Sequence, residues 1–375
     1  MNFGFSEEQD LLRREARKLL DEQCPMKEVR RLGETPEAYS SELWKQLAEL
    51  GWLGLTLPEQ YGGAELGWID LAILLEEVGR GLFPSPLTSC TLAAAAILES
   101  GSDAQKLARL PGLADGSQLG SVALAEQIGV FGNEGIELCG ERRGDSWVLN
   151  GVKCFVTDPE AADFFVVAFR TGERAEDLAL GVIDAAARGV SAQSFPMMDT
   201  TKRLGNLTLD AVLVGADSIL GEAGGVAGAV AHLFDCGAVA VTAELVGAAE
   251  AALDMTVQYA KDRVQFGSPI GRFQGVKHPL AEMFVQVESA KSLLYEAGWA
   301  LDARPADLSR TVSRAKAYAS DAFLRIGIDG VQLHGTLAYT HEYDMQLYLK
   351  RSKWAAPMFG DSDYHYDRLL RLRGL

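Results

Sequence analysis

The 375-residue sequence has little of several features that mark large classes of protein. Its five cysteines are odd in number and scattered, and no pair has the spacing of a metal site. We therefore expect small buried thiols in a reducing cytoplasm, with neither disulfides nor a metal centre. No stretch reaches the roughly 20 apolar residues of a membrane span. The N-terminus lacks the basic region and apolar core of a signal peptide. These gaps predict a cytoplasmic protein that has no membrane partner.

Positive charge is also scarce. The 35 Lys and Arg residues are outnumbered by 52 Asp and Glu, which gives a net charge of −17. This balance argues against nucleic acid as a partner, although local Arg and Lys still allow an anionic small ligand. The hydrophobic content of 48% and charged content of 23% are ordinary for a globular chain of two or three domains or lobes.

The hydrophobic period changes twice along the chain, which predicts three domains of an α+β protein. Residues 1–118 read as helices, beginning with a capping box in which Ser6 is the N-cap and Gln9 is N3. Residues 119–222 contain short runs near period 2 and predict a β-domain. Residues 223–375 return to helical spacing and predict a four-helix bundle.

Three local signals refine this outline. Asn150-Gly151 lies between two apolar runs and predicts a hairpin turn. Two helical stripes predict buried faces in the bundle. The first comprises Val276, Leu280, Met283, Phe284, Val287, Ala290, Leu294 and Ala297, and the second comprises Val312, Ala315, Ala319, Ala322 and Ile326.

The stretch Arg263–Gln274 separates two long helical patterns. Gly267, Pro269 and Gly271 break the helices and predict a short connection. A guanidinium can bind phosphate in a fork, and Phe can cover a ring, so this set suits an anionic cofactor that contains rings. The alternative is a plain loop whose Phe residues fill a gap between core helices.

Arg263-x-x-Phe266-Gly267-x-Pro-Ile-Gly-x-Phe-Gln274 resembles the signature of the acyl-CoA dehydrogenase family. The resemblance extends from Ser6 to Arg368 and includes the run Pro58-Glu-x-Tyr-Gly-Gly. It implies a helical N-terminal lobe, a middle β-domain and a C-terminal four-helix bundle. It also implies that the Arg, Phe and Gln of this stretch hold the FAD of a neighbouring subunit.

A second FAD element of the family, Gln-x-His-Gly-Gly-x-Gly, is similar to the segment that begins at Gln332. Gln332 and Gly335 match and are expected to bind the cofactor. Thr336 and Ala338 replace two glycines of the motif. Those glycines let backbone N–H groups approach the FAD pyrophosphate without a Cβ in the way.

The β-domain matches the family less well. The loop Thr-Glu-Pro-Gly, which in the family lies against the flavin, is represented by Ala125-Glu126-Gln-Ile-Gly. Glu126 is the strong positional match and is expected to bind the cofactor. The family's Lys-x-Trp-Ile-Thr is represented by Lys153-Cys-Phe155-Val-Thr157. The resemblance implies that Phe155 packs on the isoalloxazine and that Thr157 reaches toward its N5. The alternative is a Phe and a Thr in an ordinary strand.

Dehydrogenation of an acyl-CoA requires a base for the α-proton. The family uses a Glu at one of two places, which fall here at Gly237 and Asp361. Asp361 is therefore the predicted base, with Asp363 and His365 as second choices. The alternative is that Asp361 is only the N-cap of the last helix. Glu244 is expected to be structural.

Three hypotheses follow. The first is an FAD-dependent acyl-CoA dehydrogenase that passes electrons to an electron-transfer flavoprotein. The second is a non-catalytic subunit of an α2β2 assembly that supports FAD bound by a sister chain. The third is another flavin-dependent oxidation of a substrate without CoA. The family implies a tetramer, either a homotetramer or a heterotetramer with a homologous subunit.

Overall fold

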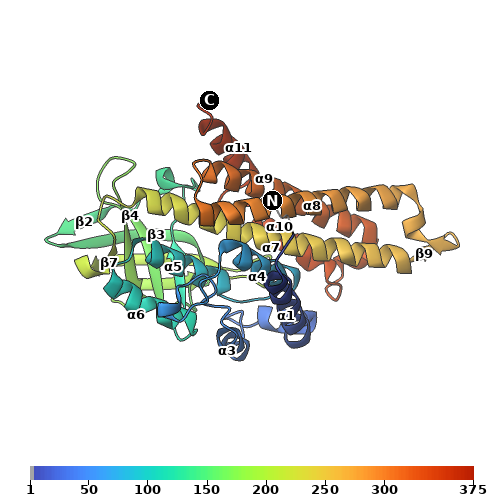
Figure 1. The fold of residues 1–375 in the computed structure, drawn as a ribbon, viewed down its shortest axis with the longest axis horizontal. Coiled ribbons are helices and arrows are strands. Elements are labelled where there is room, and N and C mark those ends of the chain that lie inside the picture. The colour runs from blue at the N-terminus through green and yellow to red at the C-terminus, as the bar shows by residue number, and fades with distance from the viewer. Residues whose placement is uncertain (1–3) are drawn as a thin grey trace. The chain divides into compact units, whose positions relative to one another are not determined.

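The computed structural model describes residues 4–375, which divide into two compact units (Figure 1). The helical unit comprises residues 4–31, 67–83 and 238–375, and the β-containing unit comprises residues 32–66 and 84–237. Helices from the first part of the chain therefore belong to both units. The three-domain boundaries given above divide the sequence in a different way and stay a prediction.

The helical unit contains the predicted C-terminal bundle together with the first helices of the chain. The predicted capping box is confirmed, because Ser6 Oγ accepts from Gln9 N at 3.2 Å and Gln9 Oε1 accepts from Ser6 N at 3.0 Å. The helices that lie wholly or partly in this unit are α1 (Glu7–Gln23), α2 (Met26–Gly33), α4 (Trp68–Arg80), α7 (Ala227–Asp262), α8 (Gln274–Ala303), α9 (Leu308–His334), α10 (Met345–Ala355) and α11 (Ser362–Arg371).

Two glycines let α4 and α7 touch backbone to backbone. A Cβ added at Gly247 would lie 1.8 Å from Glu76 O, and one added at Gly79 would lie 2.1 Å from Glu244 O. Neither site leaves room for a side chain, so only glycine allows this packing. The close approach fixes α7 within the helical unit.

The two predicted stripes are buried to different extents. All five residues of the stripe on α9 are buried, as predicted. On α8, Met283, Val287, Ala290, Leu294 and Ala297 are buried, but the Phe284 side chain is 56% exposed, so its predicted burial is wrong. One residue further along a helix is a rotation of about 100°, which carries Phe284 away from the face of Met283.

The β-containing unit has two four-stranded sheets, three α-helices that lie wholly within it and the first part of α7. One sheet has the order β1-β4-β5-β8 and the other β2-β3-β7-β6. The strands are β1 (Gly120–Ala123), β2 (Gly140–Arg143), β3 (Ser146–Thr157), β4 (Phe164–Arg170), β5 (Leu178–Asp184), β6 (Val190–Ser194), β7 (Leu204–Val214) and β8 (Ile219–Leu220). The helices are α3 (Ser41–Glu49), α5 (Leu87–Ser100) and α6 (Asp103–Ala114).

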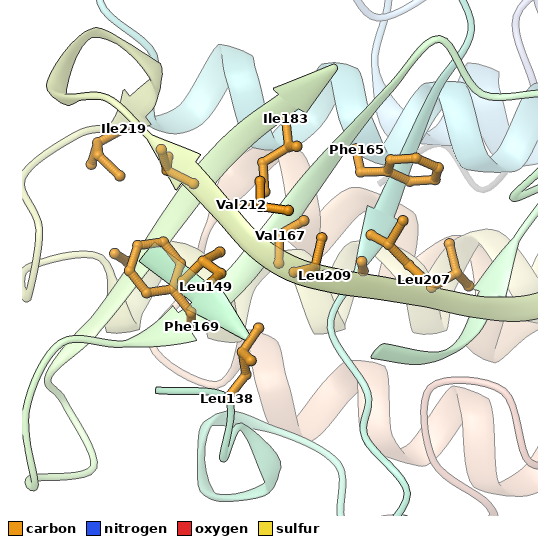
Figure 2. Close-up of a cluster of buried hydrophobic side chains, with 14 of the residues drawn as sticks. Leu138, Leu149, Phe165, Val167, Phe169, Ile183, Leu207, Leu209, Val212 and Ile219 are labelled. Atoms are coloured by element: carbon orange, nitrogen blue, oxygen red, sulfur yellow. The ribbon is translucent and has the colours of Figure 1, made fainter. Parts of the chain in front are cut away.

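Apolar side chains from both sheets meet in one cluster (Figure 2). Phe165, Val167 and Phe169 of β4 are fully buried there. They share the cluster with Leu149 of β3 and with residues of β7, such as Leu207. Such a two-sheet core holds β3, which carries predicted site residues, in a fixed position.

The predicted hairpin at Asn150-Gly151 is wrong. Strand β3 runs through both residues, with a register shift against β7 between Leu149 and Gly151. The Asn150 Oδ1 accepts from Ala211 N at 2.7 Å, so the side chain satisfies a backbone group of the neighbouring strand. Asn-Gly suits a β-bulge as well as a turn, because glycine relaxes the backbone in both.

Helix α7 differs from the expectation that no stretch of the chain is apolar enough for a membrane span. By length and composition it is apolar enough to cross a membrane. However, 83% of its apolar window is buried inside the structure, as in the core helix of a globular protein.

Candidate functional site

The short connection that the glycines and proline predict between α7 and α8 is a hairpin, not the plain loop of the alternative reading. Strand β9 (Val264–Gln265) pairs antiparallel with β10 (Ser268–Pro269). The two turn residues, Phe266 and Gly267, have φ values of 52° and 77°. Two positive φ values in a two-residue turn define type I′, which normally favours Asn-Gly. Figure 1 shows this hairpin at the far end of α7 and α8.

Phe266 occupies this turn at an energetic cost. A left-handed conformation is unfavourable for a bulky residue, by about 1–2 kcal/mol. The side chain gains little burial in return, since it is 94% exposed and meets Phe273 edge-on at 6.0 Å. The reading in which this ring fills a gap between core helices is therefore wrong. Arg263 and Gln274, at the two ends of the hairpin segment, are also exposed.

The segment after α9 presents a second open site. Gly335 caps the helix with φ 67°, and a Cβ added to it would meet nothing within 4 Å. Gln332 and Thr336 are exposed, whereas Ala338 is fully buried. The Ala that replaces a glycine of the family motif therefore points inward. Only the Thr336 replacement adds a side chain to the exposed surface.

His334 of the same motif is part of the support beneath this segment. Its ring lies between Tyr259 and Tyr343, with centroid distances of 4.4 and 5.2 Å. Its Nδ1 donates to Gly330 O at 2.7 Å. Burial lowers the pKa of His334, which favours the neutral ring.

In the β-containing unit, a bulge turns Phe155 out of its strand. The register of β3 against β7 shifts between Lys153 and Val156, and Phe155 has φ 56°. Its ring is 48% exposed and meets Phe195 edge-on at 6.3 Å. Phe155 therefore lies in a bulge and not in a regular stretch of strand. Thr157, at the end of β3, is partly exposed.

Glu126 and Lys153 form a buried pair beside this bulge. Lys153 is fully buried, and its Nζ donates to the Glu126 carboxylate and to Leu124 O. The same carboxylate accepts from the backbone N–H groups of Glu137 and Leu138 at 2.9–3.0 Å. Burial outweighs the attraction of Glu126 and lowers the pKa of Lys153 to about 8. The Glu126 carboxylate thus closes the loop that follows β1.

Asp361 is exposed and is the N-cap of α11. Its Oδ1 accepts from Tyr364 N at 2.9 Å. Asp361 therefore caps α11, and its role as the catalytic base stays a prediction. Glu244 is buried and pairs with the equally buried Arg351 at 3.1 Å, which agrees with its expected structural role.

Comparison with known proteins identifies the family. The model described as acyl-CoA dehydrogenase, C-terminal domain, matches residues 224–372, and the model for the N-terminal domain matches residues 6–117. Acyl-CoA dehydrogenase IpdE2 of Mycolicibacterium smegmatis is 35% identical over 95% of this chain and 96% of its own length. This chain belongs to the acyl-CoA dehydrogenase family.

Solved structures agree with this assignment. Butyryl-CoA dehydrogenase from Megasphaera elsdenii has a TM-score of 0.91 at 26% identity, with full coverage of both chains. A variant of the Tcur3481-Tcur3483 steroid ACAD has a TM-score of 0.89 at 32% identity, with 98% coverage of both. The predicted fold and the prediction of a flavin-dependent oxidoreductase are confirmed, as is FAD at the level of the family.

Each unit of this acyl-CoA dehydrogenase, taken alone, has residues that fit part of an FAD. The helical unit exposes a guanidinium (Arg263), two amides (Gln274 and Gln332) and the open backbone at Gly335. These groups suit a pyrophosphate and an adenine nucleotide. The β-containing unit exposes the Phe155 ring, which suits a flat ring system. The donor set therefore fits the cofactor.

Proposed function

We propose that this chain catalyses the α,β-dehydrogenation of an acyl-CoA thioester, with Asp361 as the base. The proposal is supported by the exposed carboxylate at the α10–α11 junction. This is one of the two places to which the family resemblance assigns the catalytic Glu. Arg263, Phe266 and Gln274 would hold the FAD of a neighbouring subunit. Gln332 and Gly335 would also bind FAD, and Phe155 and Thr157 would contact the flavin.

The chemistry assigned to this chain is the removal of one proton. The Asp361 carboxylate takes the α-proton of the thioester, and the C–H electron pair becomes the new α,β double bond. FAD, when bound, supplies the acceptor for the hydride that leaves the β-carbon. Only one carboxylate oxygen of Asp361 is needed for the cap, so Oδ2 remains for the proton. An electron-transfer flavoprotein is the proposed electron acceptor, in a cytoplasmic setting.

Two substitutions of Asp361 separate the base from the cap. Asparagine is as good an N-cap as aspartate but cannot take the proton. We expect Asp361→Asn to retain the unfolding temperature and to lower kcat by about 10²–10⁴-fold. Asp361→Ala should lower kcat similarly and also cost about 1 kcal/mol of stability. Wild-type turnover by a fully flavinated Asp361→Asn protein would show that Asp361 is only a cap.

A second candidate function is that of a supporting subunit. Thr336 stands where the family motif has glycine, and the Glu126 carboxylate is used within its own loop. The name of the Tcur3481-Tcur3483 steroid ACAD joins two designations, and this chain resembles it over 98% of its length. In this case the hairpin at Phe266 would complete an FAD site in a sister chain.

The visible absorption spectrum of the purified chain decides between these two functions. One FAD per chain, bleached by an acyl-CoA, supports the self-sufficient dehydrogenase. The supporting-subunit function predicts that the chain binds no flavin alone. It predicts one FAD per two chains after co-expression with a homologous chain. In the latter case Asp361→Asn should leave the turnover of the complex unchanged.

A further inference from the structure

Lys316 of α9 is a fully buried lysine whose partners are mainly backbone carbonyls. Its Nζ lies 2.9 Å from each of Ser320 Oγ, Ala356 O and Gly360 O. Lysine is almost never buried without paired groups, because desolvation of an ammonium is costly. The two carbonyls belong to the segment that joins α10 to α11, so Lys316 holds that segment to α9.

This segment has an unusual backbone immediately before Asp361. Phe359 and Gly360 are both left-handed, with φ of 54° and 98°. A Cβ at Gly360 would lie 2.3 Å from Tyr364 Cδ1, so no other residue fits there without a shift. His365 Nε2 donates to Phe359 O at 3.0 Å. Each of the two peptides before Asp361 is thus held by a buried nitrogen.

The start of α11 is tied to the same stretch of α9. Asp321 accepts from Ser362 Oγ at 2.5 Å and from Tyr366 Oη at 2.9 Å. Two residues of α9 therefore hold the junction from both sides of Asp361 in sequence: Lys316 binds residues before it, and Asp321 binds residues after it. The Asp361 carboxylate lies between two fixed points of the backbone.

The charge of Lys316 acts on the same carboxylate. Burial lowers the pKa of Lys316 to about 7, against the attraction of Asp361 and Asp321. The titratable or charged groups of α11 near this cluster are Asp363, Tyr364, His365, Tyr366 and Arg368. Both Lys316 and Arg368 disfavour a charged His365. A neutral amine would still donate to both carbonyls and accept from Ser320, so the geometry survives deprotonation.

We propose that Lys316 is a positioning residue for Asp361: by fixing the Phe359–Gly360 turn it sets where the carboxylate lies. This inference rests on the proposed catalytic role of Asp361. Nothing in the hydrophobic pattern reveals it, because Lys316 simply interrupts an apolar stretch of α9.

The test compares Lys316→Met with Ser320→Ala in the flavinated protein. Ser320→Ala removes one neighbour of Nζ but leaves both carbonyl contacts, so it should behave like the wild type. Lys316→Met should lower kcat at least about tenfold with KM little changed, since a displaced base affects chemistry and not uniform binding.

Hydrogen–deuterium exchange of residues 357–366 supplies a readout that does not depend on activity. Exchange should be faster in Lys316→Met and unchanged in Ser320→Ala. If Lys316→Met does not fold, Lys316→Gln, which retains a donor, is tested in its place. We then expect smaller changes in kcat and in exchange, in the same directions. Wild-type exchange and a wild-type kcat in the folded variant would overturn the proposal.

The Asp361→Asn and Lys316→Met variants together distinguish failure of the proposed function from failure of the role proposed for Lys316. If Asp361→Asn keeps its turnover, the proposed function fails, and Lys316→Met should then change only the exchange of the turn. If Asp361→Asn is inactive while Lys316→Met retains kcat, only the role of Lys316 is refuted.

Discussion

At the scale of single residues, several charged side chains bind backbone groups, and their neighbours in sequence give no sign of this. Glu126 closes a loop, Lys316 holds a turn and Arg203 donates to backbone carbonyls of residues 33, 35 and 36. In each case a charged group lies against backbone groups that have no partner in a helix or sheet. These contacts satisfy carbonyl and N–H groups that would otherwise be costly to bury.

His365 predicts how stability depends on pH. Burial, with help from Lys316 and Arg368, lowers its pKa to about 3. The unfolded chain therefore binds one more proton than the folded chain between about pH 6.5 and 3, so this group lowers the unfolding free energy as pH falls through that window. The expected slope is about 1.4 kcal/mol per pH unit at most.

Urea unfolding of the wild type and His365→Gln at pH 7.0 and 5.5 measures this effect. The wild type should lose more stability than the variant between the two pH values. His278→Gln, which changes an exposed histidine of α8, is the matched control and should lose as much as the wild type. Equal losses in all three proteins would contradict a buried neutral His365.

At the scale of elements, the β9–β10 hairpin exposes an aromatic ring where the backbone favours Asn. Phe266→Asn should therefore leave the protein as stable as the wild type or up to about 1 kcal/mol more stable. If the ring contacts the cofactor of a neighbouring chain, the same change should weaken FAD binding at least about tenfold, because aromatic contact area is lost.

Thermal unfolding of the apoprotein and a flavin fluorescence titration test these two effects separately. Leu107→Asn is the control. It replaces an exposed apolar residue of α6 and should change neither the unfolding temperature nor the FAD affinity. A marked loss of stability in Phe266→Asn would mean that the ring packs within its own chain, and unchanged FAD binding would refute its role at the cofactor.

At the scale of the whole molecule, exposed apolar side chains of the helical unit predict association. Besides Phe266, these are Phe284 and Trp299 of α8, at 56% and 52% exposed, and Tyr339 at 79%. Large exposed apolar residues of this kind often mark protein interfaces. We expect the 40.4-kDa chain to sediment as a tetramer, either alone or with a homologous chain.

Analytical ultracentrifugation of Phe284→Lys tests the association. A lysine on an apolar interface should shift the protein toward smaller species, whereas Leu107→Lys should not. A wild-type chain that stays monomeric both alone and with a homologous chain would contradict the predicted tetramer.

Much of the fold follows from the sequence by itself. The capping box at Ser6, the stripe on α9 and the change to period 2 near residue 120 depend on neighbours within a few positions, and each is found in the structure. The stretch Arg263–Gln274 also identified the family without knowledge of any partner. Such signals are local, so no tertiary contact is needed to read them.

Only the tertiary structure decided the rest. Asn150-Gly151 forms a bulge because β7 supplies Ala211 N as a partner, and Phe284 is exposed because the α8 face that packs inward is narrower than its apolar pattern. Lys316 meets Gly360 from 44 positions away in the sequence. A residue's partner across such a distance is set by how the elements pack, and packing depends on the whole chain instead of on any one segment.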